Sequence, residues 1–285
     1  MAAPKKLQPI NSQKDVVMIG AGHLGEILLA AWLKQKVLSP PRTGVYLRSQ
    51  KSAQRIKKAY KLQTFSQQKL EPLPIAKTYI IAVRPAEWKD IKEKVRDALK
   101  YTPGSFVVSI MAGITATQLE TDLNRAAIVG MTNTCAKVGE ALSSLYASKS
   151  CSVAQKRYAK KIFAALGPVF ELPEDKFFAA TALGGSHPAF ILWILAELQK
   201  IVQSELSLPD GKENSLLWVR QIMAGALALT ENESNLQNLI EQIATPGGCT
   251  QEGLNALKEL QVDELLKVVF TRCKIKAEML GRAPK

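Results

Sequence analysis

Three glycines near the start of the chain could bring a phosphate group against the backbone. Gly20, Gly22 and Gly25 form a GxGxxG pattern that directly follows a short apolar run and directly precedes a segment with helical spacing. The first glycine permits a tight turn, the second lets the backbone approach a pyrophosphate, and the third lets the helix pack closely on the strand. The free N–H groups at the helix N-terminus attract the phosphates. The pattern predicts a dinucleotide site that also includes His23 and Leu24, although a strand–helix turn without ligand can carry the same glycines.

The residues after the second apolar run decide which dinucleotide is expected. An Asp or Glu there would bind the ribose 2′-hydroxyl of NAD and repel a 2′-phosphate. The chain has Arg48 and Ser49 instead, and between Ile27 and Leu70 it has ten Lys or Arg and no acidic residue. A guanidinium can stack on adenine and bind a 2′-phosphate, to which a serine hydroxyl can donate a hydrogen bond. The segment predicts NADP(H) in preference to NAD(H); the alternative is a set of solvated surface cations.

The net charge of the chain is +13 and its pI is about 9.5. Such a charge either keeps a surface soluble or attracts an anionic partner. No zinc finger, helix-turn-helix signature or aromatic-studded RNA motif is present. A phosphate-rich cofactor is therefore a more economical partner than a nucleic acid, and no nucleic-acid binding is expected.

Cysteines, histidines and apolar runs limit the location and the metal content. The four cysteines and the two histidines, His23 and His187, show no metal-ligand spacing, so no metal site is expected. Scattered cysteines suit a reducing cytosol. The longest apolar run, Ala189 to Ala196, is too short for a membrane span and is interpreted as a buried helix. The first 14 residues lack the apolar core of a secretory signal. These features predict a cytoplasmic protein without a membrane partner.

Apolar runs alternate with helical segments over the first 172 residues. Strands are expected at 15–19, 44–48, 78–83, 105–111, 126–132, 142–147 and 168–172, with helices at 26–36, 85–100 and 153–165. This alternation predicts an α/β fold with a Rossmann-type, doubly wound parallel sheet that helices cover on both faces. Residues 1–14 are expected to form a flexible tail, and residues 15–172 the NAD(P)-binding domain.

Strand patterns end after Pro173. Helices are expected at 174–181, 187–205, 211–230, 234–243, 250–260 and 262–282. Their apolar faces are wider than a small helical domain can bury, as around Leu217 and Ile222. Obligate oligomers bury surfaces of this kind. Residues 173–285 are therefore expected to form an all-α domain that carries substrate contacts and joins subunits into a homodimer or a larger ring.

Six motifs, in order, make the chain resemble the pyrroline-5-carboxylate reductase family from about residue 15 to the C-terminus. They are Gly20–Gly25, Ala82–Pro85, Val108–Ile114, Met131–Thr134, Thr181–Phe190 and Thr245–Thr250. The last is the most specific, because it is similar to the Ser-Pro-Gly-Gly-x-Thr signature of the family. The resemblance implies reduction of 1-pyrroline-5-carboxylate, a small cyclic imino acid, to L-proline with hydride from NAD(P)H.

The resemblance also implies which residues form the site. Cofactor contacts are implied for Ala82, Val83, Arg84, Pro85, Ala112, Gly113 and Asn133, and substrate contacts for Ser186, Thr245, Gly247, Gly248, Cys249 and Thr250. Adjacent glycines before a helix can form an anion nest for the substrate carboxylate. Thr250 would place its hydroxyl near the imine nitrogen and is the candidate catalytic residue. Each Gly-Gly pair could instead be a simple helix-start turn.

Several residues depart from the family pattern on the substrate side. They are Val129, Cys135, Gly184 and His187. The imidazole of His187 could donate a proton, crowd the pocket, or pack away from it. The alternatives are a divergent paralogue that reduces another cyclic imine, or a cofactor-binding regulatory protein without turnover. A dehydrogenase of small hydroxy acids is a third, and it would need a Lys or His base.

Overall fold

The computed structural model describes residues 13–281 of the chain. Most of the expected tail, residues 1–12, lies outside that range, and Lys14 already begins the first strand, β1 (Lys14–Ile19). The chain divides into two compact units, one of Met1–Ser186 with Cys273–Lys285 and one of His187–Arg272. We call them the sheet unit and the helical unit. The division differs from the predicted boundary at 172/173, because residues 174–186 and the end of the last helix pack within the sheet unit.

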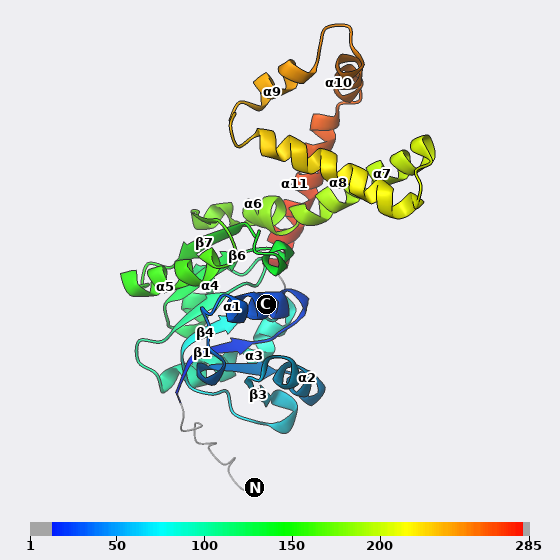
Figure 1. Ribbon diagram of the computed structural model, residues 1–285. Coiled ribbons are helices and arrows are strands. Elements are labelled where there is room, and N and C mark those ends of the chain that lie inside the picture. Colours follow the sequence, from blue (N-terminus) through cyan, green and yellow to red (C-terminus); the bar gives the residue numbers. More distant parts are fainter. Residues whose placement is uncertain (1–12, 282–285) are drawn as a thin grey trace. The chain divides into compact units, whose positions relative to one another are not determined.

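An eight-stranded sheet organises the sheet unit, in the order β3-β2-β1-β4-β5-β6-β7-β8 (Figure 1). The other strands are β2 (Thr43–Leu47), β3 (Gln63–Ser66), β4 (Ala76–Ile81), β5 (Phe106–Ser109), β6 (Ala127–Met131), β7 (Ser143–Ala147) and β8 (Val169–Glu171). The predicted doubly wound fold is confirmed. The edge strand β3 was missed because its short, mostly polar sequence carries no apolar run.

The predicted parallel sheet reverses direction at one strand pair. β7 pairs antiparallel with β6 and parallel with β8, so β7 and β8 run opposite to the six other strands, which are parallel to one another. The connection between β6 and β7 contains only a 3-10 turn, η4 (Thr134–Lys137). A parallel return would need a crossover of about a dozen residues or more, usually through a helix. The chain therefore turns back directly.

Helices cover both faces of the sheet because its central strands are apolar on both faces. Along β1, Val16 and Met18 join one buried cluster, whereas Val17 and Ile19 join the other. The first cluster includes residues of α1 (His23–Lys34), α2 (Gln50–Tyr60) and α5 (Val153–Ala164). The second includes residues of α3 (Trp88–Lys100), α4 (Ala116–Leu123) and α6 (Phe177–Ala180).

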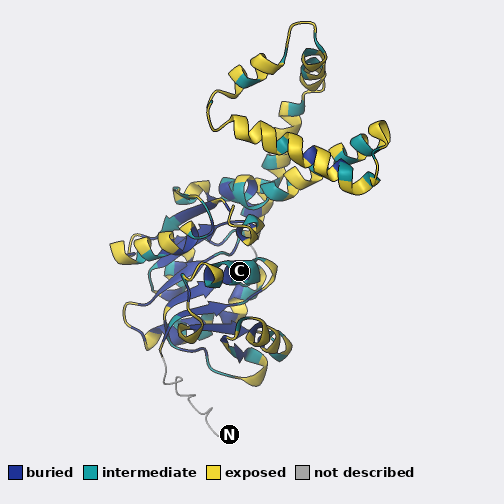
Figure 2. Cartoon of the chain, viewed as in Figure 1, coloured by how far each residue is buried: buried dark blue, intermediate teal, exposed yellow. Residues whose placement is uncertain are grey.

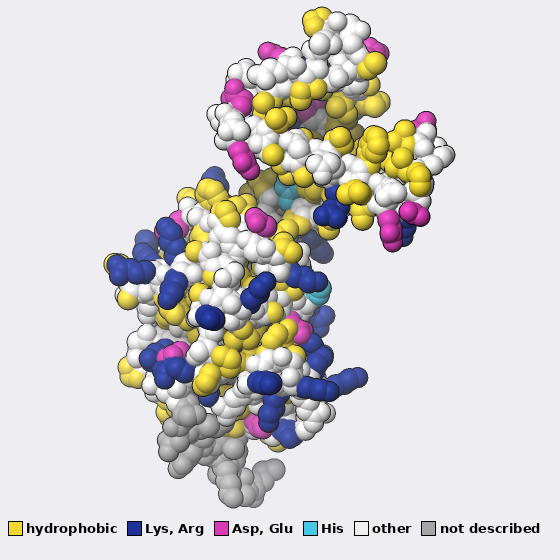
Figure 3. All heavy atoms as spheres, viewed as in Figure 1, with side chains coloured by type: hydrophobic (Ala, Val, Ile, Leu, Met, Phe, Trp, Pro, Cys, Tyr) yellow, Lys and Arg dark blue, Asp and Glu magenta, His cyan; other side chains and the backbone are white. Residues whose placement is uncertain are grey.

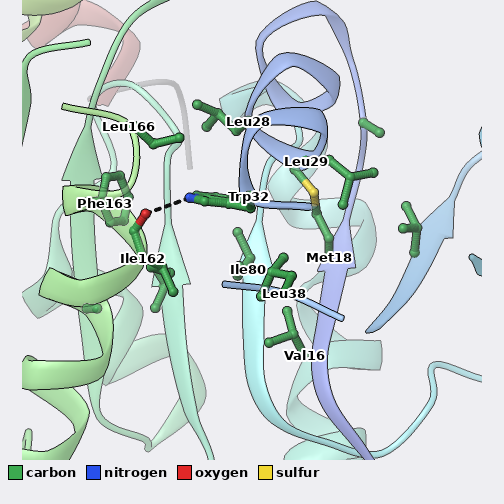
Figure 4. Packing of buried hydrophobic residues seen from close by; sticks show 14 of the residues in the cluster. Val16, Met18, Leu28, Leu29, Trp32, Leu38, Ile80, Ile162, Phe163 and Leu166 are labelled. Atoms are coloured by element: carbon green, nitrogen blue, oxygen red, sulfur yellow. Dashed lines mark hydrogen bonds between the residues drawn. The ribbon is translucent and has the colours of Figure 1, made fainter. Parts of the chain in front are cut away.

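Trp32 fixes α1 against α5 within the first cluster (Figure 4). Its ring is fully buried and meets Phe163 edge to face, with ring centroids 6.1 Å apart. The indole N–H donates a hydrogen bond to the Ile162 carbonyl at 2.7 Å. A buried tryptophan with a satisfied N–H combines a large apolar contact with a specific one. This contact holds α1, the helix that begins within the glycine pattern.

The helical unit contains α7 (His187–Leu206), α8 (Gly211–Leu229), α9 (Leu236–Ile243), α10 (Cys249–Glu259) and most of α11 (Val262–Gly281). The expectation of a buried helix at 189–196 is wrong for the single chain, because α7 has no buried residue. Figure 2 shows that most residues of this unit are exposed. The stretch Glu174–Leu206 even has the length and composition of a membrane span. Apolar surface of this extent requires a cover.

Candidate functional site

A cleft of about 440 Å³ opens at the carboxyl ends of β1, β2 and β4. Eight of the predicted cofactor residues line it: Gly20, Gly22, His23, Arg48, Ser49, Ala82, Val83 and Arg84. Ligands of doubly wound sheets bind in a crevice at this edge. A larger cavity, of about 660 Å³, lies at the amino ends of the strands and has none of the predicted residues in its lining. Position relative to the strands, rather than size, makes the smaller cleft the candidate site.

The three glycines of the pattern have the backbone geometry that a pyrophosphate turn needs. Gly20 has φ +87°, and a Cβ there would lie 2.7 Å from the Ala82 carbonyl oxygen. At Gly22, the N-cap of α1, a Cβ would meet nothing within 4 Å, so this backbone is open to an approaching group. A Cβ at Gly25 would lie 3.1 Å from the Met18 side chain, so the absence of a side chain at Gly25 lets α1 pack close to β1. The cradle therefore fits a dinucleotide phosphate at a helix N-terminus.

The basic end of the cleft contains an acidic residue that the sequence analysis missed. Glu87 Oε1 accepts hydrogen bonds from Arg48 Nη1 at 3.1 Å and from Arg84 Nη2 at 2.7 Å. The hydrogen bond from Arg84 is the main cause that lowers the pKa of the Glu87 carboxyl from its ordinary value of 4.5. Glu87 Oε2 also accepts from the Arg84 backbone N–H at 3.3 Å. The sequence signal that could have indicated the contact between Arg84 and Glu87 is their three-residue spacing, which is the spacing of a capping box.

Ser49 lies beside Arg48 at the start of α2. It is the N-cap of that helix, and its hydroxyl accepts from the Ser52 backbone N–H at 3.2 Å and donates to the Ser52 hydroxyl at 3.0 Å. Ser52 lines the same cleft. Both hydroxyls therefore lie where they could contact a group bound by Arg48. The basic charge is concentrated in this part of the chain, since the helical unit has six Lys or Arg against eleven Asp or Glu. Lysines and arginines are spread over the visible surface of the sheet unit (Figure 3).

The remaining predicted cofactor residues do not line this cleft. Leu24, Gly25 and Pro85 belong to the turns that shape it. Ala112 and Gly113 follow β5, and Asn133 follows β6, so they stand farther along the same edge of the sheet. Gly113 has φ +83°.

Asn133 connects this edge to the segment that precedes the helical unit. Its side chain is buried, its amide nitrogen donates to the Gly184 carbonyl at 3.0 Å, and its oxygen accepts from the Cys135 N–H at 3.0 Å. Gly184 belongs to a π-helical turn, η6 (Thr181–Gly185), that the sequence did not predict. Such turns are frequent at functional sites. Ser186 follows, and its hydroxyl accepts a hydrogen bond from the Cys273 thiol at 3.3 Å.

The predicted substrate loop belongs to the helical unit. Gly247 has φ +74°, and Gly248 is the N-cap of α10. A Cβ at Gly248 would lie 2.5 Å from the Thr245 hydroxyl oxygen, so the turn requires glycine there. Cys249 and Thr250 form the first turn of the helix and are exposed. The first N–H groups of a helix have no partner within it, so they can receive an anion.

The structure shows the surroundings of two residues that depart from the family pattern, His187 and Val129. His187 begins α7, and its ring meets Phe270 edge to face with centroids 5.1 Å apart. This contact supports packing of the imidazole within the helical unit. Val129 is buried in β6, on the face covered by α3 and α4. Within residues 13–281, no group of three or more His, Cys, Asp or Glu side chains could hold a metal ion.

Comparisons with known proteins find matches for both the helical part and the dinucleotide-binding part of the chain. Residues 174–280 match the family model of pyrroline-5-carboxylate reductase dimerisation, and residues 15–113 match that of the coenzyme F420-dependent NADP oxidoreductases. The pyrroline-5-carboxylate reductase of Thermus thermophilus is 26% identical over 85% of this chain and 89% of its own length. That of Methanosarcina acetivorans is 26% identical over 94% and 98%.

Solved structures show the same architecture. A pyrroline-5-carboxylate reductase from Coxiella burnetii, 26% identical, matches 95% of this chain and 99% of its own with a TM-score of 0.80. A Plasmodium falciparum pyrroline carboxylate reductase with NADP bound, 22% identical, matches 94% and 98% with a TM-score of 0.82. At that identity the second likeness shows the fold alone.

Proposed function

This chain belongs to the pyrroline-5-carboxylate reductase family, and we propose that it reduces 1-pyrroline-5-carboxylate to L-proline with NADPH. The observation that carries the proposal is the extent of the likeness. Curated reductases align with up to 94% of the chain, a span that needs both the dinucleotide-binding part and the helical part. The proposed reaction takes place in the cytoplasm, in a homodimer or a larger ring.

The cofactor fits the cleft that the glycine turn forms. When bound there, it supplies the hydride for the C=N bond, as nicotinamide cofactors do. The chain's contribution is to bind and to orient. The open backbone at Gly22 and the start of α1 receive the pyrophosphate, and Arg48 with Ser49 receives the 2′-phosphate. This assignment of Arg48 is the basis for the preference for NADPH over NADH.

The Thr245–Thr250 loop is assigned to the substrate. The Gly248 N–H is already used, because it donates to the Thr245 carbonyl at 3.0 Å. The N–H groups of Cys249, Thr250 and the next residue, Gln251, have no intrahelical partner, since Glu252 is the first to bond back to the Gly248 carbonyl. These groups would hold the substrate carboxylate, and the Thr250 hydroxyl would face the imine nitrogen. Fixing the imine relative to the hydride donor can supply much of the acceleration.

The test is turnover by the purified protein. We expect oxidation of NADPH that depends on added 1-pyrroline-5-carboxylate, and the reverse oxidation of L-proline at high pH. Tight binding of NADPH without either reaction would instead support a cofactor-binding protein without turnover. Turnover with a different cyclic imine, and none with pyrroline-5-carboxylate, would support a divergent paralogue.

A further inference from the structure

The Glu87 carboxylate accepts hydrogen bonds from both Arg48 and Arg84, at the end of the cleft where the adenosine of the cofactor would bind. Glu87 comes from η3 (Pro85–Glu87), which follows β4, whereas Arg48 stands at the end of β2. Its Oε1 lies 3.1 Å from Arg48 Nη1 and 2.7 Å from Arg84 Nη2. The two guanidinium side chains are 78% and 77% exposed, whereas Glu87 is 27% exposed. The acid is therefore the fixed member of the trio, and the arginines are the members free to turn.

The backbone holds the carboxylate in place. Glu87 Oε2 accepts from the Arg84 backbone N–H at 3.3 Å, so the side chain is anchored to the same turn that carries one of its partners. Its pKa is lowered by that arginine, which keeps the carboxylate charged at neutral pH. Any second anion that approaches Arg48 then meets a negative charge that cannot easily move away.

A 2′-phosphate is such an anion. It carries close to two negative charges and seeks the same guanidinium N–H groups that Glu87 occupies. A ribose 2′-hydroxyl carries no charge and does not compete. Glu87 therefore opposes the phosphate-bearing cofactor selectively, although it comes from a different strand than the acid that usually marks an NAD site.

We propose that Glu87 is a specificity-determining residue, which limits the preference for NADPH by competing with its 2′-phosphate for Arg48 and Arg84. The inference rests on the proposed function, because it assumes that Arg48 binds the 2′-phosphate. It goes further in that it identifies a residue that weakens this preference.

Glu87→Gln removes the charge and keeps one acceptor oxygen. That oxygen can still accept hydrogen bonds from both arginines, whereas the amide nitrogen in place of Oε2 no longer accepts from the Arg84 backbone N–H. Asp90→Asn is the matched control, because Asp90 lies in the same cleft three residues farther on and has no ion pair among the described residues. Calorimetric binding of adenosine 2′,5′-bisphosphate and of adenosine 5′-monophosphate compares the two ligand types without any turnover.

We expect Glu87→Gln to tighten the bisphosphate about fivefold, as expected for one or two solvent-exposed charge interactions, and to change the monophosphate less than about twofold. In an Arg48→Ala background the gain should become smaller, because Arg84 is then the only arginine of the pair for which Glu87 and the 2′-phosphate compete. Asp90→Asn should change both ligands by the same small factor. The inference is overturned if Glu87→Gln weakens the bisphosphate, or if its effect equals that of Asp90→Asn.

Two outcomes distinguish the role of Glu87 from the assignment of the 2′-phosphate site. If Arg48→Ala weakens the bisphosphate selectively but Glu87→Gln does not tighten it, only the role of Glu87 is lost. If Arg48→Ala affects neither ligand, the assignment of the 2′-phosphate site is lost, and the role of Glu87 with it.

Discussion

Gly113 and Gly281 meet backbone to backbone, so closely that neither position has room for a side chain. A Cβ on Gly113 would lie 2.5 Å from the Gly281 nitrogen and 2.9 Å from the Ala277 carbonyl oxygen, and a Cβ on Gly281 would collide with the Gly113 carbonyl. The end of α11 therefore rests on the loop after β5. The family resemblance implies cofactor contacts for Ala112 and Gly113 in that loop, so the C-terminal turn supports a segment that we propose binds the cofactor.

Replacing Gly113 should show how much this contact contributes. Gly113→Ala combines a left-handed φ of +83° with the collision. Gly104→Ala is the matched control, because Gly104 has φ +81° and nothing within 4 Å of its would-be Cβ. We expect the control to lower the free energy of unfolding by about 1 kcal/mol and Gly113→Ala to lower it by about 3 kcal/mol. Urea unfolding measures both, and equal losses would contradict the contact.

Local sequence patterns predicted most of the fold. The glycine turn, its flanking strand and helix, and the six C-terminal helices follow from spacing within a short window, and the structure confirms these elements. The direction of β7 did not follow, because it depends on the absence of a crossover helix rather than on the strand's own residues. The burial of α7 did not follow either, since periodicity indicates that a face needs a cover but not which chain supplies it.

The same distinction between local patterns and contacts of distant segments applies to the candidate site. The cleft residues were predictable because the GxGxxG pattern and the residue after β2 have fixed places in a doubly wound sheet. The ion pair between Glu87 and Arg48 was not, because Arg48 lies 39 residues away and meets Glu87 only through the strand order β2-β1-β4. Likewise, the bond from Asn133 to Gly184 spans 51 residues. Contacts between distant segments require the tertiary fold.

Arg48 should matter for one cofactor and not for the other. Arg48→Ala removes the charged side chain that we propose binds the 2′-phosphate, so we expect NADPH to bind about fivefold more weakly, a modest effect because the side chain is largely exposed. NADH should bind as before. Arg55→Ala is the control, because Arg55 lies within α2, seven residues after Arg48, and is paired with Glu26. Fluorescence titration measures all three proteins, and equal losses for NADPH and NADH would exclude a contact with the 2′-phosphate.

The exposed apolar faces of the helical unit should hold subunits together. Ile222 on α8 is 64% exposed in the single chain, and the region that contains it matches the dimerisation model. A glutamate placed inside an apolar interface would be buried without a partner, so Ile222→Glu should shift the protein toward monomers in sedimentation. Val153→Glu on α5, at a residue 73% exposed in the sheet unit, should leave the assembly intact. A wild-type protein that sediments as an active monomer at micromolar concentration would contradict the proposal.

The Thr245–Thr250 loop allows the sharpest test of the proposed chemistry. Thr250 lies inside the first turn of α10, and its hydroxyl makes no hydrogen bond to another described residue. Because the N-cap of α10 is Gly248, Thr250 does not cap the helix, and alanine at this position should not lower the melting temperature. If the hydroxyl bonds to the reacting imine, Thr250→Ala should instead lower kcat roughly 10- to 1000-fold with NADPH affinity unchanged.

Thr250→Ser restores the hydroxyl and should recover much of the lost rate. Gly248→Val tests the other half of the loop, because its side chain would collide with the Thr245 hydroxyl and displace the N–H groups assigned to the carboxylate. We expect that variant to lose turnover and to keep its affinity for NADPH, whose phosphates we propose to bind at the glycine turn after β1. Steady-state kinetics, cofactor titration and a melting curve on the three proteins separate these effects. Unchanged kcat in Thr250→Ala, with a normal melting curve, would remove Thr250 from the catalytic site.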